Sequence, residues 1–125
     1  MSYIDGFVLA VPTANKQKFI DHAKQFDALF IELGATRILE CWGDDVKAGK
    51  LTVFRRAVDA KDEDAVVFSW VEWPDKATRD AAMSKTEDLM KSEPRWDFAK
   101  NPITFDGKRM IYGGFEPVVE LGSSA

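Results

Sequence analysis

The chain has a single cysteine, Cys41, and a single histidine, His22, among its 125 residues. One cysteine cannot form an intrachain disulfide, and a Cys/His metal site needs several such ligands at close spacing. The sequence also lacks a glycine-rich phosphate-binding loop and the motif of a nucleophile elbow. We therefore expect no bound metal and no cofactor.

The chain has no excess of positive charge and no long hydrophobic run. The 17 Lys and Arg residues against 21 Asp and Glu give a net charge of −4. Nucleic-acid binding needs a basic surface, so we expect no nucleic-acid partner. No segment approaches the roughly 20 apolar residues that span a bilayer, and the N-terminus has no leader-like run. These features predict a cytoplasmic protein with no membrane partner.

The residues that are present predict a folded globular protein. Hydrophobic residues make up 46% of the chain, and four residues are tryptophans. A chain of this length can bury a sizeable core. We therefore expect a single domain over residues 1–125.

Four segments have the pattern of β-strands, and two segments between them have the pattern of helices. The predicted strands are Tyr3–Val11, Arg37–Trp42, Val66–Trp73 and Met110–Phe115. Apolar residues recur every three or four positions over 14–33 and predict a helix that Gly34 ends. Asp75 is expected to cap a second helix that runs to about residue 91. Residues 51–58 are interpreted as an additional strand or an extended arm, and 92–108 as an irregular crossing.

This βαββαβ order predicts the α+β class and a ferredoxin-like fold. Its antiparallel sheet would have the strand order 4-1-3-2 and both helices on one face. The strands are nevertheless apolar on both faces, since Phe68 and Trp70 alternate with Val67 and Val71. The uncovered face needs a second layer, which a second copy of the chain supplies most simply. We expect a homodimer that pairs these faces as a dimeric α/β barrel.

Several motifs resemble those of the DUF1428 family of small bacterial proteins. They are YIDGFVLAVP at 3–12, ECWGDDV at 40–46, VVFSWVEWP at 66–74 and FDGKRMIYGGFEP at 105–117. The resemblance covers nearly the whole chain and departs from the family pattern at 93–102. It implies a ferredoxin-like, dimeric α/β-barrel fold and no activity.

Each main strand carries a carboxylate in or beside it, and alternation groups these acids with aromatic residues. Glu40 shares a face with Trp42, and Glu116 shares one with Tyr112. The opposite, mostly aliphatic residues are expected beneath the helices. A face of aromatics and acids suits a barrel interior or cleft that holds a small organic molecule. The candidate ligand-binding residues are Trp42, Trp70, Tyr112, Glu40 and Glu116.

Two residues are candidates for catalysis, and each has a structural alternative. Glu72 lies near the end of the most apolar strand, where it could carry a proton or, instead, pair with an arginine. His22 lies at the edge of the helical stripe. It could act as an acid, a base or a haem ligand, or it could be a half-exposed helix residue. Cys41 is expected to be a buried, inert thiol.

Three functions are consistent with these features. The first is a homodimeric barrel protein that binds a small organic molecule in the barrel or in the helix–sheet cleft. The second is a cofactor-independent enzyme, similar to a small oxygenase or isomerase, that uses carboxylate acid–base chemistry. The third is a purely structural dimer whose aromatic face is the subunit interface.

Overall fold

A four-stranded antiparallel sheet organises the molecule, with its strands in the order β2-β3-β1-β4. The computed structural model describes residues 2–122. The strands are β1 (Tyr3–Pro12), β2 (Arg37–Trp42), β3 (Asp64–Trp73) and β4 (Ile111–Phe115). This is the predicted order 4-1-3-2, and it confirms the α+β prediction.

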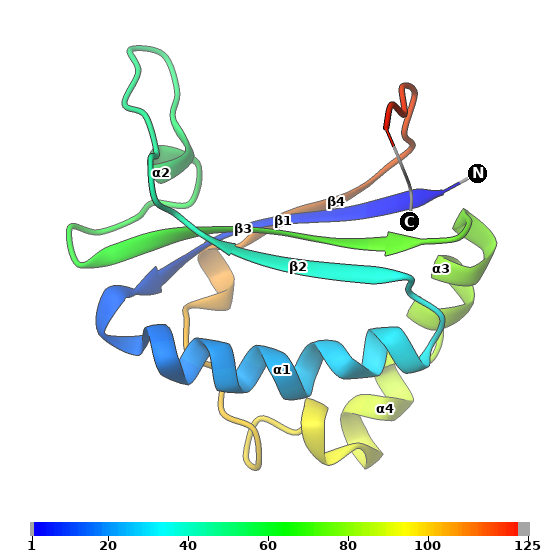
Figure 1. The fold of residues 1–125 in the computed structure, drawn as a ribbon. Coiled ribbons are helices and arrows are strands. Elements are labelled where there is room, and N and C mark those ends of the chain that lie inside the picture. Colours follow the sequence, from blue (N-terminus) through cyan, green and yellow to red (C-terminus); the bar gives the residue numbers. More distant parts are fainter. Residues whose placement is uncertain (1, 123–125) are drawn as a thin grey trace.

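The longest helix, α1 (Lys16–Glu32), lies along one side of the sheet (Figure 1). It follows a 3₁₀ turn at Thr13–Asn15. It ends as predicted before Gly34, whose φ of +118° is readily adopted only by glycine.

The predicted second helix is two shorter helices, α3 (Lys76–Met83) and α4 (Thr86–Ser92). The Ser84 and Thr86 hydroxyls donate hydrogen bonds to the carbonyls of Ala81 and Met83, at 2.6 and 2.8 Å. Such local bonds compete with a continuous helix and accompany the break here. Asp75 caps α3 as predicted and accepts a 2.7 Å hydrogen bond from the backbone N–H of Thr78.

Residues 51–58 do not form an additional strand, so that alternative is wrong and the alternative of an arm remains. They contain a short helix, α2 (Phe54–Ala57), in an arm over residues 43–57 that rises from the side of the sheet opposite α1 (Figure 1). The Arg55 guanidinium donates to the carbonyls of Asp64 and Lys61, at 2.9 and 2.6 Å, and Arg56 donates to that of Leu51. Side-chain hydrogen bonds thus hold this segment in place of a strand ladder.

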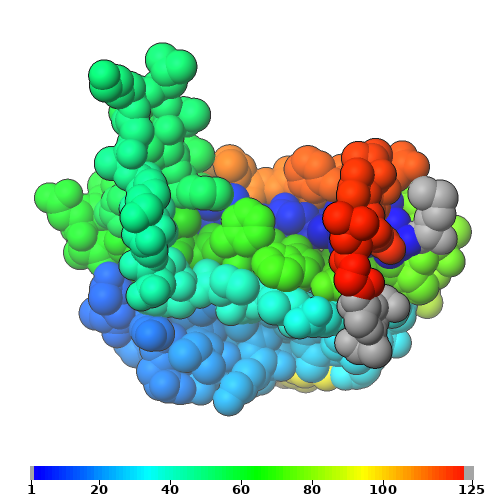
Figure 2. All heavy atoms as spheres, turned by 45° about the horizontal axis from the view of Figure 1, so that its top comes forward, coloured from blue at the N-terminus to red at the C-terminus, as the bar shows by residue number. Residues whose placement is uncertain are grey.

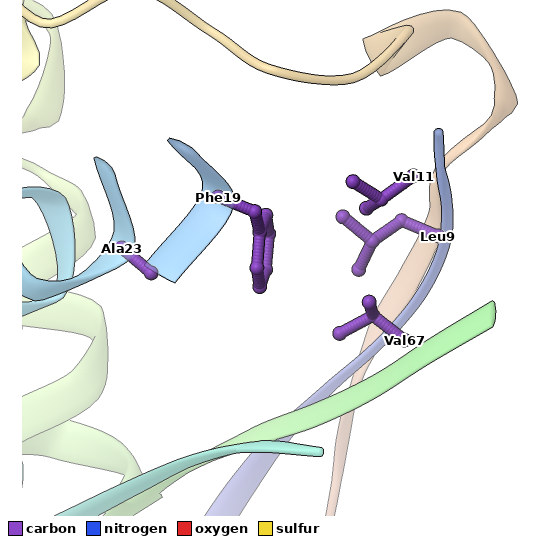
Figure 3. Close-up of a cluster of buried hydrophobic side chains, with 5 residues drawn as sticks. All are labelled: Leu9, Val11, Phe19, Ala23 and Val67. Atoms are coloured by element: carbon purple, nitrogen blue, oxygen red, sulfur yellow. The ribbon is translucent and has the colours of Figure 1, made fainter. Parts of the chain in front are cut away.

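A hydrophobic core lies between the first half of α1 and the two central strands. Figure 3 shows Phe19 of α1 pointing toward Leu9 and Val11 of β1 and Val67 of β3. Ala23 lies one helical turn further along α1 on the same side. Burial of these side chains fixes the distance between helix and sheet.

The register between strands corrects the expected composition of the two faces. Glu40 lies opposite Ser69, and Trp42 lies opposite Val67, so both face α1. Val8 and Ile111 pair on the other face, beside Trp70. Glu40 and Trp42 of β2 were expected on the face away from the helices, but they lie on the α1 side. Val8 of β1 and Ile111 of β4 were expected beneath the helices, but they lie on the open face. Alternation shows which residues of one strand share a face. Only the register between strands shows which residues of neighbouring strands share that face.

Asp5 is a buried carboxylate with a full set of partners at the end of the sheet near α3. Its exposed fraction is 4%. It accepts a 2.9 Å hydrogen bond from Trp73 Nε1 and pairs with the Arg79 guanidinium at 2.9 Å. These contacts connect β1, β3 and α3, so the role of Asp5 is structural.

We expect Asp5→Ala to lower the free energy of unfolding by about 3–5 kcal/mol, because it leaves the Arg79 charge and the Trp73 N–H without their buried partner. Urea denaturation monitored by circular dichroism measures this loss. Asp80→Ala is the matched control, since Asp80 pairs with the same arginine at the surface, at 3.1 Å. An equal loss in both variants would contradict the assignment.

Candidate functional site

Two acidic side chains meet between α1 and the edge strand β2. Phe19, Ala23 and Asp27 recur every four residues, so they share the face of α1 that looks onto the sheet. Glu40 projects from β2 toward the same place and lies within hydrogen-bond reach of Asp27. Ser69 lies directly opposite Glu40 on the neighbouring strand β3.

The surroundings of this carboxyl pair favour protonation. Glu40 as a whole residue is exposed and Asp27 is half-buried, and the protein packed around the two carboxyl groups removes part of their hydration. This desolvation, together with repulsion from Asp27, raises the pKa of Glu40 to about 8. Desolvation likewise raises the pKa of Asp27 to about 6. Near neutral pH the pair therefore shares one proton and carries one negative charge.

The carboxyl pair lies where two hollows adjoin. An outer groove of about 380 Å³ runs between α1 and β2, and Trp42 and Lys16 lie along it. An inner cavity of about 360 Å³ lies beneath α1, against the central strands. Asp27, Glu40, Ala23 and Phe19 border both. The pair is thus accessible from the surface and from the interior.

Six phenylalanine side chains line the inner cavity. They come from β1, from α1 and from the segment between α4 and β4. They are Phe7, Phe19, Phe26, Phe30, Phe98 and Phe105. The polar residues on this wall are His22, Asp27, Glu40 and Ser69. An apolar hollow with a few convergent polar groups is the usual form of a small-molecule site.

His22 borders the inner cavity and is buried, with an exposed fraction of 7%, so the alternative of a half-exposed residue is wrong. Its Nδ1 lies 3.0 Å from Asn101 Oδ1. Asn101 Nδ2 donates to the carbonyl of Arg95 at 2.8 Å, so Asn101 Oδ1 is the acceptor for His22. The proton is therefore on Nδ1, and Nε2 carries a lone pair. Burial lowers the pKa of His22, which keeps the ring neutral.

The structure brings only some of the sequence candidates to this place. Glu40 and His22 border the inner cavity, and Trp42 borders the outer groove. Trp70 borders a separate hollow of about 510 Å³ on the open face of the sheet, the face turned away from α1. Tyr112 also borders this hollow, but it lies opposite Phe7 in the register and stacks on that ring at 6.1 Å, so its side chain is on the α1 side of the sheet. The remaining candidates, Glu72 and Glu116, border none of these three hollows.

Glu72 and Cys41 occupy structural surroundings on the open face. Glu72 accepts a 2.9 Å hydrogen bond from Trp70 Nε1, a local contact rather than the expected pairing with an arginine. Cys41 lies opposite Phe68 and is half-buried, so full burial of the thiol was a wrong expectation. Within residues 2–122, no cluster of three His, Cys, Asp or Glu residues is arranged to hold a metal ion.

Asp27 was absent from the sequence candidates. The sequence did contain a pattern that could have identified it: Asp27 follows Phe19 and Ala23 at the same four-residue spacing, so an acid lies on an otherwise apolar helical stripe. Its partner could not be identified in the same way, since Glu40 lies on another element.

Three comparisons place the chain among known proteins. The family model for DUF1428, described as a protein of unknown function, matches residues 2–107. The uncharacterized protein YbaA of Escherichia coli K12 is 50% identical over 120 residues, which are 96% of this chain and 99% of that protein. YbaA of Shigella flexneri matches equally well.

A solved structure shares the fold. It is the crystal structure of a dimeric ferredoxin-like protein from an uncultured marine organism. Its TM-score is 0.61 at 14% sequence identity, and the match covers 96% of this chain and 98% of that one. The prediction of a ferredoxin-like fold is confirmed. In the part of the chain that the structure describes, no helix is long and apolar enough to cross a membrane.

The raised pKa of Glu40 predicts how stability depends on pH. An unfolded glutamate has a pKa of about 4.3, and the folded value is about 8. Between these values the folded protein binds more protons than the unfolded chain, so this carboxyl makes stability fall as the pH rises. We expect Glu40→Gln to gain stability relative to the unaltered protein as the pH rises through this window.

Urea titrations at a series of pH values measure this difference. Glu87→Gln is the matched control, because Glu87 is an exposed glutamate on α4 that borders neither hollow. A constant difference between Glu40→Gln and the unaltered protein across the window would contradict the assignment.

Proposed function

The chain belongs to the DUF1428 family, and we propose that it binds a small organic molecule in the cleft between α1 and the sheet. The observation that carries this proposal is the Asp27–Glu40 carboxyl pair at the boundary of the outer groove and the inner cavity. The cavity is within the size range of small-molecule sites, which begins at about 300 Å³. Its aromatic wall suits an apolar ligand body, and the carboxyl pair suits a polar group.

The energetics of the pair also favour a binding role. Two carboxyls held together without a cation destabilise the folded chain, because each loses hydration and one repels the other. The ion pairs among residues 2–122 involve neither Asp27 nor Glu40. Perturbed groups of this kind in a cleft are candidates for function.

Acid–base catalysis at the same place is a second candidate function. The raised pKa of Glu40, about 8, allows it to give or take a proton near neutral pH. His22 Nε2 supplies a lone pair on the wall of the same cavity. If the bound molecule is a substrate, these groups are the candidate proton carriers, in place of Glu72.

We further propose that the chain is a homodimer whose subunits pair through their open sheet faces. The exposed fractions of Phe68, Ile111 and Phe115 there are 43%, 47% and 60%. Figure 2 shows the arm over residues 43–57 and the segment after β4 rising at opposite ends of this face. The marine protein of the same fold is described as dimeric, which supports this assembly. The hollow beside Trp70 would then lie inside the barrel.

Ligand binding is tested by native mass spectrometry of the protein after incubation with an Escherichia coli small-molecule extract. We expect a bound organic molecule that Ala23→Leu reduces strongly, because Ala23 borders both hollows and a larger side chain fills them. Overpacking costs about 1–3 kcal/mol, so folding is checked by circular dichroism. Ala81→Leu, at an exposed position of α3, is the control. Equal occupancy in the two variants, or no bound molecule at all, would refute the cleft as a binding site.

The dimer is tested by sedimentation equilibrium at micromolar concentration. We expect a dimer, and we expect Trp70→Ala to raise the dissociation constant about 30-fold or more, as truncation of a buried interface aromatic costs about 2 kcal/mol or more. Val71→Ala is the matched comparison, because Val71 faces the helices and should reduce subunit stability without changing the dissociation constant. A monomeric protein, or dissociation caused by Val71→Ala instead, would contradict the assignment of the faces.

A further inference from the structure

The charges around the inner cavity are unbalanced. Asp27 and Glu40 border it, and no lysine or arginine does. Lys16 and Lys24 line the outer groove, where Lys16 Nζ lies 5.4 Å from the centre of the Trp42 ring. Neither lysine forms an ion pair with the two acids within the described residues. A cation bound in the inner cavity would balance the charge of the carboxyl pair.

The polar groups on the cavity wall are also mostly acceptors. The carboxylate oxygens of Asp27 and Glu40 accept hydrogen bonds, and the Ser69 hydroxyl, opposite Glu40 on the neighbouring strand, has acceptor lone pairs as well. His22 Nδ1 donates to Asn101, which leaves the Nε2 lone pair as an acceptor. No described residue donates to this Nε2. A ligand that satisfies this wall must therefore bring N–H or O–H donors.

The rest of the cavity wall suits the apolar body of an organic ligand. The rings of Phe26 and Phe98 stack with their centres 6.2 Å apart, and the His22 and Phe26 rings stack at 5.4 Å. Because these rings pack on one another, they form a continuous apolar surface beside the carboxyl pair. One cavity can therefore hold the charged group of a ligand and its apolar part.

We propose that the ligand of this cleft is a small organic amine, bound as its ammonium ion, with its N–H groups on Asp27 and Glu40 and its apolar body against the phenylalanine rings. This inference rests on the proposed function and names its ligand class. The ammonium replaces the proton that the two carboxyls share. Binding near neutral pH therefore releases up to one proton to solvent.

The titratable and charged groups that face the pair are few. Lys16, His22 and Lys24 come from α1, and the lining contributed by β1, β3 and the segment between α4 and β4 is uncharged. His22 is held neutral by burial. Proton release on binding thus reports the carboxyl pair.

Isothermal titration calorimetry with three probes of similar shape tests the proposal. They are 2-phenylethylamine, the neutral 2-phenylethanol and the anionic 3-phenylpropanoate. At pH 7 we expect the amine to bind about 10- to 100-fold more tightly than the alcohol, as hydrogen bonds to charged groups contribute more than neutral ones. The anion should bind most weakly. Titrations in phosphate and in MOPS, whose ionisation enthalpies differ and neither of which is a primary amine, measure the proton released with the amine.

Two variants and a control separate the carboxyl pair from the cavity. Glu40→Gln and Asp27→Asn keep the shape of the site, so each should remove most of the preference for the amine and most of the proton release while alcohol binding persists. Glu87→Gln, outside both hollows, should change neither. Two variants are used so that a folding defect in one leaves the other informative.

The outcomes distinguish this inference from the proposed function. Equal binding of amine and alcohol, unchanged in both variants, would overturn the amine assignment and leave the cleft as a small-molecule site. Failure of all three probes to bind would also overturn the amine assignment. The mass-spectrometric comparison of Ala23→Leu with Ala81→Leu then decides the proposed function by itself.

Discussion

The antiparallel pairing of β1 with β3 determines the position of almost every side chain of interest. These two central strands are ten residues long and pair without interruption. Their register places Phe7, Leu9 and Val67 under α1 and turns Phe68 outward. A shift of one residue in one strand would move its buried set to the opposite face, so core burial strongly opposes it. The outer strands β2 and β4 pair with β3 and β1, and this pairing decides which of their side chains face α1.

Two acidic sites on the helix side of the sheet differ in how the protein compensates the desolvation of a carboxylate: Asp5 is buried, whereas Asp27 is half-buried and Glu40 is exposed. Asp5 has an arginine and an indole N–H, and these contacts connect three elements. Asp27 and Glu40 have each other and a serine hydroxyl, so part of their charge is suppressed by protonation. The first arrangement stabilises the fold. In the second arrangement the negative charge is balanced only when a proton or a cation binds, which is why we propose the carboxyl pair as the ligand site.

The sheet also separates two proposed roles. The cleft that we propose for the ligand lies on the α1 side, whereas the surface that we propose for self-association lies on the open side. Gly114 makes room for the Tyr3 ring where β4 meets β1, which explains one of the two glycines within that strand by packing. With the roles on opposite faces, a change on one side need not disturb the other. The segment 92–102 supplies Phe98 of the cavity wall and the Asn101 partner of His22.

The sequence by itself determined the four strands, the first helix and their order, because alternation and helical periodicity are properties of neighbouring residues. It predicted a single second helix where the structure has α3 and α4, and the second layer that it predicted stays a proposal. It also identified Glu40, Trp42 and His22, which border the two hollows in the structure. Only the tertiary structure decided that Glu40 meets Asp27 and that Trp70 and Glu72 lie on the opposite face. Partners on different elements depend on strand register and on how the helix lies across the sheet. Both are set by burial of the whole core, which local pattern does not encode.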